Sequence, residues 1–486
     1  MSFTRTTRSA DSSFDLVKRS LLQRDGLPFA EALTVVQIEQ AFEEEGVSFN
    51  VSESPCETKP SPDEDRPIYT MGVTLWAMLS QAIFDGSQRS CRAAVQRVAV
   101  YSALRGLDVS STNTGAYSRA RAKVPEGVVQ RLTEGVAERC ERVIPEGWRW
   151  KGFRALVVDG TTHSMPDTKQ NQEEYPQSST QKEGLGFPIL RAVALTSLAT
   201  GMVIGHTTGP YQGKESGETA LFRTLFPKLR EGDLVLADRY YGGWFMLALL
   251  LELGVEVVTR LHQHREADFD QGTRLGTKDH LTTWAKPARP EWLDQEAYDR
   301  LPEHLELREL EVAVNVPGFR CESFVVVTSL RDHRVHSYEE IAALYRRRWI
   351  VEIELRDIKV TMGLGILRRK TPAAVRQEIW TGLLAYNLIR QSALASECQP
   401  NQLSFAASLQ MIANTWVLAA VPPLIRIDDR ERLIALRILN GYCHRIANRP
   451  SRIEPRAVKR RPAPIALLTE PRKLARKKLV TKHQTS

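Results

Sequence analysis

The feature that most constrains the fold of this chain is a change of pattern at Trp150. Downstream of it, short apolar runs bounded by Gly, Pro and Asp replace the longer helical periods found upstream. Such runs predict strands, and two helical patterns lie between them. In chain order the segments are strands at 155–158, 192–198 and 202–206, a helix at 218–229, a strand at 234–237, a helix at 243–253 and a strand at 255–261.

Three strands followed by alternating helix and strand is the order of a ribonuclease H-like domain. We therefore expect an α/β core with a mixed sheet and flanking helices. The pattern is interrupted from Gln263 to about Glu322, and another strand follows at 324–329. This interruption predicts a β-rich insertion before the last helix of the core. That helix begins at Ser337, because Ser337 and Glu340 have the spacing of a capping box.

Composition divides the rest of the chain into helical regions on both sides of this core. Residues 51–66 are rich in Ser, Pro, Asp and Glu, which is typical of a linker. The predicted division is 1–66 (helix and linker), 67–149 (helical domain), 150–262 (first part of the core), 263–322 (insertion), 323–395 (last strand and long helix of the core), 396–450 (helices) and 451–486 (basic tail).

The positive charge is concentrated at the C-terminus. From Ser451 onward there are eleven Lys and Arg against two Glu, which more than accounts for the formal net charge of +8. Such a tail either binds nucleic acid phosphates or is simply solvated. The six cysteines include no Cys-x-x-Cys pair, which disfavours a zinc ribbon. Apolar runs are far shorter than the ~18 residues of a membrane span, so we expect a soluble intracellular protein.

Two aspartates stand directly after predicted strands. Asp159 follows Leu156-Val157-Val158, and Asp238 follows the strand at 234–237. Carboxylates at the C-terminal ends of strands in an open sheet project into the crevice where ligands bind. Asp is also common where strands turn, so each residue alone is compatible with a purely structural role.

The long helix carries a stripe of polar groups. At about 100° per residue, four of them share an arc of roughly 60° over four turns, whereas Glu354 falls on another face. An acidic side chain between basic ones is the arrangement expected of a metal ligand that lies beside phosphate-binding residues. A solvated face with an i,i+4 ion pair is the alternative. The four residues are Tyr345, Arg348, Glu352 and Lys359.

Together these residues resemble a known family. The spacing Tyr345-x2-Arg348-x3-Glu352-x6-Lys359, preceded by the two aspartates, is similar to the Tyr-(2)-Arg-(3)-Glu-(6)-Lys signature of the IS4-family DDE transposases. The blocks at 159–161 and 236–241, the tail at 452–464 and the N-terminal segment 112–121 also resemble that family. The resemblance extends from about Leu27 to Lys478.

The resemblance implies a DNA transposase of an insertion sequence, which cuts at terminal inverted repeats and joins the element to target DNA. Its chemistry needs no protein nucleophile, because two divalent ions can stabilise the attacking and departing oxygens. Hard oxygen ligands favour Mg²⁺, with Mn²⁺ as a substitute. The implied catalytic residues and metal ligands are Asp159, Asp238 and Glu352. The implied DNA phosphate-binding residues are Tyr345, Arg348 and Lys359.

The resemblance also implies the partners. They are terminal inverted repeats, target DNA and a second copy of the chain in a homodimer assembled on DNA, without a membrane. The expected location is the bacterial cytoplasm, in association with the nucleoid. Two alternatives stay open: a metal-dependent nuclease or resolvase of the same fold that joins nothing, and a non-catalytic repressor that binds the ends.

Other residues are compatible with two roles. Arg119, Arg121 and Lys123 either contact the terminal repeats or form a solvated helix face. Trp284 and Trp292 lie in the insertion, where a tryptophan can stack on a flipped base. Core packing is the more common role for a tryptophan.

Overall fold

The structure is a computed structural model, which describes residues 35–47, 68–69, 71–104, 113–313, 323–394, 399, 402–419 and 468–484. The predicted linker at 51–66, most of the segment 396–450 and residues 451–467 of the tail lie outside the described residues. The division into domains along the sequence remains a prediction.

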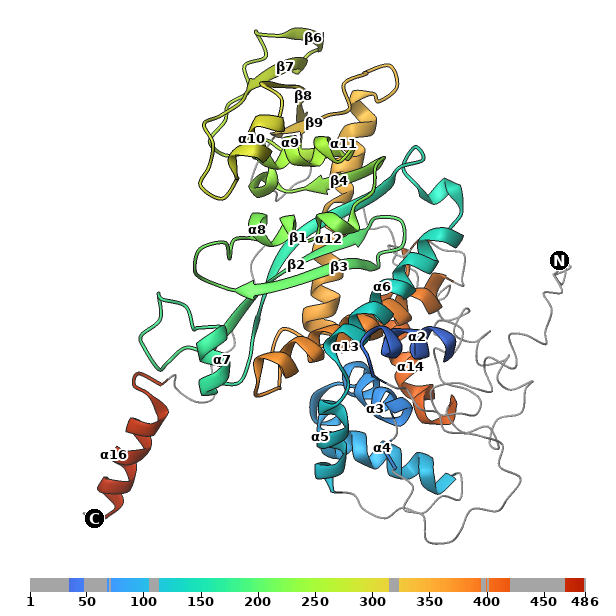
Figure 1. The fold of residues 1–486 in the computed structure, drawn as a ribbon, viewed down its shortest axis with the longest axis vertical. Helices are drawn as coiled ribbons and strands as arrows, with labels where there is room; N and C mark the ends of the chain where they lie inside the picture. Colours follow the sequence, from blue (N-terminus) through green and yellow to red (C-terminus); the bar gives the residue numbers. More distant parts are fainter. Residues whose placement is uncertain are drawn as a thin grey trace, which may run out of the picture.

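One mixed sheet runs through the centre of the molecule (Figure 1). Its nine strands lie in the order β3-β2-β1-β4-β5-β9-β8-β7-β6. The strands are β1 (Arg154–Ser164), β2 (Ile189–Ser197), β3 (Val203–Pro210), β4 (Asp233–Ala237), β5 (Glu256–Arg260), β6 (Thr273–Gly276), β7 (Asp279–Ala285), β8 (His304–Ala313) and β9 (Ser323–Thr328).

The first five strands form a ribonuclease H-like core. β1 and β3 are antiparallel to β2, whereas β4 pairs with both β1 and β5 in parallel. Parallel neighbours require crossover connections, which the two predicted helical patterns supply. They are α8 (Glu218–Arg223) with the 3-10 turn η3 (Phe226–Lys228), and α9 (Trp244–Glu252). The predicted fold class is confirmed.

The first predicted strand is longer than the sequence pattern indicated. β1 continues to Ser164, because β2 pairs with it in antiparallel register as far as Ser164↔Ile189. Asp159 therefore lies in the middle of β1, and the prediction that it follows a strand end was wrong. Asp238 does follow the end of β4, as predicted, and begins the 3-10 turn η4 (Arg239–Tyr241).

The insertion continues the core sheet. β9 pairs antiparallel with β5, and β8, β7 and β6 extend the sheet beyond it, with the short helix α10 (Gln295–Arg300) between β7 and β8. Figure 1 shows these strands at the end of the molecule opposite the N-terminal helices. The predicted β-rich insertion is confirmed, and its strands belong to the same sheet as the core.

Helices cover the other end of the molecule (Figure 1). The long helix α13 runs from the core into the N-terminal helices, where Asn387 reaches across to two other elements. Its Nδ2 atom donates to the carbonyl oxygens of Thr133 in α6 and Val203 in β3. The helices are α2 (Val35–Glu44), α3 (Met71–Ile83), α4 (Cys91–Leu104), α5 (Thr114–Ala122), α6 (Glu126–Val143), α13 (Pro372–Leu394) and α14 (Phe405–Ala419).

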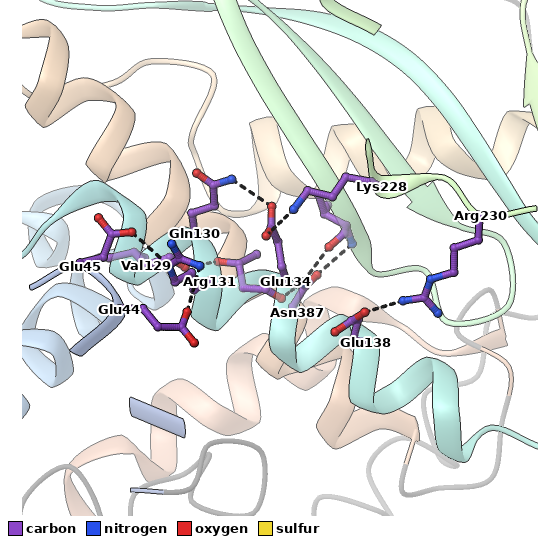
Figure 2. A network of polar contacts seen from close by, with 12 residues as sticks. Glu44, Glu45, Val129, Gln130, Arg131, Glu134, Glu138, Lys228, Arg230 and Asn387 are labelled. Carbon is purple, nitrogen blue, oxygen red and sulfur yellow. Dashed lines mark hydrogen bonds and ion pairs between the residues drawn. The ribbon is translucent and has the colours of Figure 1, made fainter. Parts of the chain in front are cut away.

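Ion pairs fix helix α6 between the core and α2 (Figure 2). On one side, Nζ of Lys228 lies 2.6 Å from Oε2 of Glu134, and Arg230 pairs with Glu138. On the other side, Arg131 pairs with carboxylates at the end of α2, at 2.9 Å from Glu44. These contacts join segments about a hundred residues apart into one body.

The end of the basic tail forms a helix, α16 (Arg472–Gln484), which projects away from the body (Figure 1). Its basic side chains are exposed, including Arg472, Lys473 and Arg476. Among the described residues, no helix is both long enough and apolar enough to cross a membrane. Cys91 and Cys140, the two cysteines in the described part, are free thiols.

Candidate active site

The parallel pairing of β1 with β4 brings the two aspartates together. The register aligns Val157 with Leu236. Asp159 and Asp238 each follow two residues later, so they occupy corresponding positions on neighbouring strands. Side chains two residues apart in a strand point to the same face, so both carboxyl groups leave the same side of the sheet.

The backbone holds both carboxylates in place. Oδ1 of Asp159 accepts a hydrogen bond from the amide of Gly160 at 2.8 Å. Oδ1 of Asp238 accepts one from the amide of Tyr240 at 2.7 Å. The hydroxyl of Thr259 donates to the carbonyl oxygen of Asp238, which ties the turn after β4 to β5.

The long helix begins as predicted but does not stay a regular α-helix. Ser337 and Glu340 form the predicted capping box. The helix is divided into α11 (Tyr338–Arg347), α12 (Trp349–Arg356) and a π-helical turn, η5 (Asp357–Thr361). Lys359 lies in the π turn, so an angle of 100° per residue does not apply to it, and the predicted common arc was wrong at that end. π turns in helices occur frequently at functional sites.

Arg348, at the junction of α11 and α12, lies among the three predicted carboxylates. Its Nη1 atom is 3.9 Å from Oδ2 of Asp159, and its Nη2 atom is 3.1 Å from Oε1 of Glu352. Burial lowers the pKa of Arg348, but Tyr345 and the carboxylates of Asp159, Glu352 and Asp238 together raise it above its ordinary value. The arginine is only 8% exposed, so water screens these interactions weakly.

Tyr345 and Lys359 occupy different surroundings. Tyr345 is buried, with its ring 5.4 Å from that of Phe324 and the Arg348 guanidinium 5.9 Å above it. Lys359 lies near the far end of β1, close to His163. Burial lowers the pKa of the His163 imidazole, and the positive charge of Lys359 lowers it further. Residues 345–359 thus run along β1: Arg348 lies beside Asp159, and Lys359 lies near His163.

Glu354 lies on the opposite face of the helix, as predicted. It is buried against α13, near Arg390, whose guanidinium is 3.6 Å from the carboxylate of Asp357. Burial raises the pKa of Glu354 to about 7. This carboxyl group therefore belongs to the packing between α12 and α13 and does not face Asp159.

The Asp159 carboxyl group is largely buried and has charges of both signs around it. The pKa of this carboxyl group is raised to about 6, chiefly by burial, and the negative charges of Asp238 and Glu218 act in the same direction. Arg348 and the Gly160 amide act in the opposite direction. A group of carboxylates in such a setting is stabilised by added positive charge.

Glu218 is a carboxylate at this site that the sequence analysis missed. It is the first residue of α8, and its carboxyl group lies directly over Gly160, where any Cβ would collide with it. The hydroxyl of Tyr241 donates to its Oε2 atom at 3.4 Å. In the sequence, the only notable feature of Glu218 is that it begins the helix after the third strand. That position does not indicate that its side chain lies near Asp159.

With Asp159 as the metal ligand that the family resemblance implies, Glu218→Gln is expected to weaken divalent-ion binding by about 10- to 100-fold, the range found when groups supporting metal ligands are changed. The substitution keeps the shape and removes a negative charge beside Asp159. Calorimetric titration of the purified protein with Mn²⁺ measures the effect.

Glu215→Gln provides the matched control. Glu215 precedes the same helix, is 59% exposed and pairs with Arg223 at 2.6 Å. Equal Mn²⁺ affinity in the two variants and the unchanged protein would remove Glu218 from the site.

The described residues include no group of three His, Cys, Asp or Glu side chains close enough to hold one metal ion. Asp159 lies in β1 and Asp238 follows the end of the neighbouring strand β4, whereas Glu352 is linked to Asp159 through Arg348 and keeps 56% of its side chain exposed. The i,i+4 ion pair that was the alternative interpretation is present between Arg348 and Glu352, and the same arginine also contacts Asp159.

The remaining candidates are placed as follows. Trp284 is buried and donates to Oε1 of Glu309 at 2.8 Å, which is a packing role. Trp292 is 37% exposed, with the guanidinium of Arg223 3.8 Å from its ring, so it is not a core residue. Arg119, Arg121 and Lys123 lie at the end of α5, where Arg119 and Lys123 are exposed and Arg121 is partly buried.

Known proteins with similar sequences are transposases. The family model described as "Transposase DDE domain" matches residues 150–388. The chain is 28% identical over 364 residues to the transposase InsG for insertion sequence element IS4 of Escherichia coli K12, a match covering 71% of this chain and 76% of InsG. The putative transposase InsZ of the same strain is 25% identical over 142 residues, covering 29% of this chain and 46% of InsZ.

Among solved structures, the chain is similar to a piggyBac transposase synaptic complex with hairpin DNA. The TM-score is 0.40 at 8% identity, over 82% of this chain and 81% of the other. A superposition this loose does not define which residues correspond.

Proposed function

This chain belongs to the IS4-family DDE transposases, which cleave and transfer DNA strands, and we propose that its catalytic residues are Asp159, Asp238 and Glu352. One observation carries the proposal: the Arg348 side chain contacts both Asp159 and Glu352, while the β1–β4 register sets Asp238 beside Asp159. Two carboxylates from distant parts of the chain thereby share one guanidinium, and the third follows the strand next to β1.

DDE transposase domains depend on a divalent metal ion. The donor set fits one, because carboxylate oxygens are the hard ligands that Mg²⁺ prefers. Burial, together with the nearby charges of Asp238 and Glu218, raises the pKa of Asp159, and a bound cation would stabilise its charged form. Asp159, Asp238 and Glu352 would hold Mg²⁺, in two ions, with Mn²⁺ as a substitute. When bound, such ions activate the attacking oxygen and stabilise the leaving one.

The chain's own cations would position the DNA. Arg348 is preorganised by its two carboxylate contacts and by the Tyr345 ring, so its guanidinium can bind a phosphate near the scissile bond without losing much side-chain freedom. Lys359 would bind a phosphate further along β1. Tyr345 contributes by supporting Arg348, since its own ring is buried. Phosphate contacts of this kind fix register without reading sequence.

The DNA substrates in this proposal are the element's terminal inverted repeats and a target DNA. A homodimer would assemble on the DNA, because two ends must be joined, and the enzyme would act at the bacterial nucleoid. The helical region 67–149 would contribute to end binding, and the exposed basic side chains of α16 would add contacts to phosphates.

The test is a reaction of the purified full-length chain with DNA duplexes from both borders of its element and a target plasmid, in Mg²⁺. Joined products support the transposase. Cleavage without joining would indicate a nuclease or resolvase, and a mobility shift without cutting would indicate an end-binding repressor. Chelation of the metal is expected to stop cutting, and Mn²⁺ to restore it.

A further inference from the structure

A second cluster of basic side chains lies away from the carboxylates, between the N-terminal helices and the segment that follows the π turn. It lines a cavity of about 250 Å³, several times the ~30 Å³ that one water occupies in the liquid. Four arginines and a single glutamate, Glu378, line the cavity. We call it the arginine pocket, and its arginines are Arg89, Arg121, Arg368 and Arg369.

The charge of Arg369 is offset only in part by its surroundings, in which Glu378 is the nearby carboxylate. Within the part of the chain that the structure describes, no hydrogen bond or ion pair engages its guanidinium. Burial lowers the pKa of Arg369, and the positive charge of Arg121 lowers it further. Two guanidinium groups facing one cavity repel each other, and a bound anion removes that repulsion.

The one carboxylate in the pocket is already engaged. Oε2 of Glu378 accepts hydrogen bonds from the backbone amides of Arg368 and Arg369, at 2.8 and 3.0 Å. Glu378 therefore holds the backbone that presents the two arginines, and it leaves an excess of positive charge in the cavity.

The other arginines are held in place by neutral groups. Nη1 of Arg89 donates to the carbonyl oxygen of Met362 at 2.6 Å, and Nη1 of Arg121 lies 3.1 Å from Sγ of Cys91. Arg368 donates to the carbonyl oxygen of Gly86 at 3.2 Å. Contacts to carbonyl and thiol groups orient a guanidinium without neutralising its charge.

The pocket is connected to the catalytic strand. Its wall includes Leu364, whose carbonyl oxygen is hydrogen-bonded to Nδ1 of His163 in β1 at 2.8 Å. The backbone of Ile366 also pairs with Ser164, the last residue of that strand. An anion in the pocket would thus be held jointly by the N-terminal helices and by the segment that follows the catalytic helix.

We propose that the arginine pocket binds a phosphate of the DNA backbone outside the scissile position, an inference that rests on the proposed function. The planar guanidinium fork matches a phosphate bidentately, which a point charge does not. No aromatic side chain is among the described residues that line the cavity, so it offers no surface on which a base could stack. The contact therefore positions the DNA and carries no sequence preference.

Arg369→Gln tests the pocket by the salt dependence of binding. Fluorescence anisotropy with a labelled mixed-sequence DNA duplex will show roughly tenfold weaker binding. The slope of log K against log salt will become shallower by about 0.9, the value for one lost phosphate contact. The loss will be the same for an unrelated duplex sequence. Arg131→Gln is the matched control. It removes the same charge from the protein, but the charge of Arg131 is neutralised by ion pairs with Glu44 and Glu45, so the salt slope is expected to stay unchanged.

Cys91 reports on the pocket without any substitution. Cys91 is a partly exposed residue of the lining, so bound DNA will slow alkylation of its thiol several-fold, as followed by peptide mass spectrometry. Unchanged Cys91 reactivity on saturating DNA, or an unchanged salt slope in Arg369→Gln, overturns the pocket while leaving the proposed function intact. Failure of the unaltered chain to bind or cut any DNA overturns the proposed function instead.

Discussion

Asp159→Asn, Asp238→Asn and Glu352→Gln will each reduce DNA cleavage by about a thousandfold or more, while binding of the uncut DNA persists. Each substitution keeps the size of the side chain and removes a charged oxygen ligand, and groups that act together in one reaction cannot replace one another. Cleavage of end-containing DNA in Mg²⁺, measured beside a mobility-shift assay, separates loss of chemistry from loss of binding.

Glu354→Gln is the matched control for this experiment. It makes the same change two residues from Glu352, on the face that packs against α13. Because burial raises the pKa of Glu354 to about 7, the neutral amide resembles the state of this group at slightly acid pH. Near-normal cleavage is expected at pH 6.5. A loss as large as that of Glu352→Gln, in a folded variant, would contradict the assignment of Glu352.

Arg154→Met will lower the free energy of unfolding by about 3–5 kcal/mol. Arg154 and Asp233 face each other in the β1–β4 register, both buried, with hydrogen bonds of 2.8 Å and 2.5 Å between them. Removing the arginine leaves the Asp233 charge buried without its partner, and this register is the one that aligns Asp159 with Asp238. Urea unfolding followed by tryptophan fluorescence measures the loss.

The double variant Arg154→Met/Asp233→Leu isolates the cause of that loss. It removes both charges, so most of the stability is expected to return, although the amide of Arg230 also loses its acceptor. Arg142→Met removes an exposed pair with Glu138 at 3.6 Å and is expected to cost less than about 1 kcal/mol. Equal losses in Arg154→Met and Arg142→Met would show that the buried pair does not fix the β1–β4 register.

Much of the fold could be predicted because its signals are local. Apolar runs of four to seven residues marked the five core strands, and the spacing of Ser337 and Glu340 marked the start of the long helix. The candidate carboxylates were also found locally, from residues next to strands and from the spacing Arg348-x3-Glu352. Only the resemblance to a family connected these segments, since no periodicity relates residue 159 to residue 352.

Features that depend on distant partners were missed. β1 extends past Asp159 because β2 pairs with it, and β2 is more than twenty residues away. The π turn that contains Lys359 departs from the regular helix that residue spacing alone predicts. Glu218 reaches the site because α8 packs on β2 and β3, which brings its carboxyl group over Gly160 in β1. A glycine in the sequence does not say which side chain occupies the space beside it.

The sequence by itself determined which segments become strands and helices and which side chains can serve as hard ligands or phosphate-binding cations. The tertiary structure alone decided that Arg348 stands between Asp159 and Glu352, that Arg154 and Asp233 pair across the β1–β4 register, and that arginines from three separate segments share one cavity. The reason is physical: propensity and hydrophobic period act over a few residues, whereas the electrostatic environment of a site is set by groups brought together only when the sheet and its helices pack.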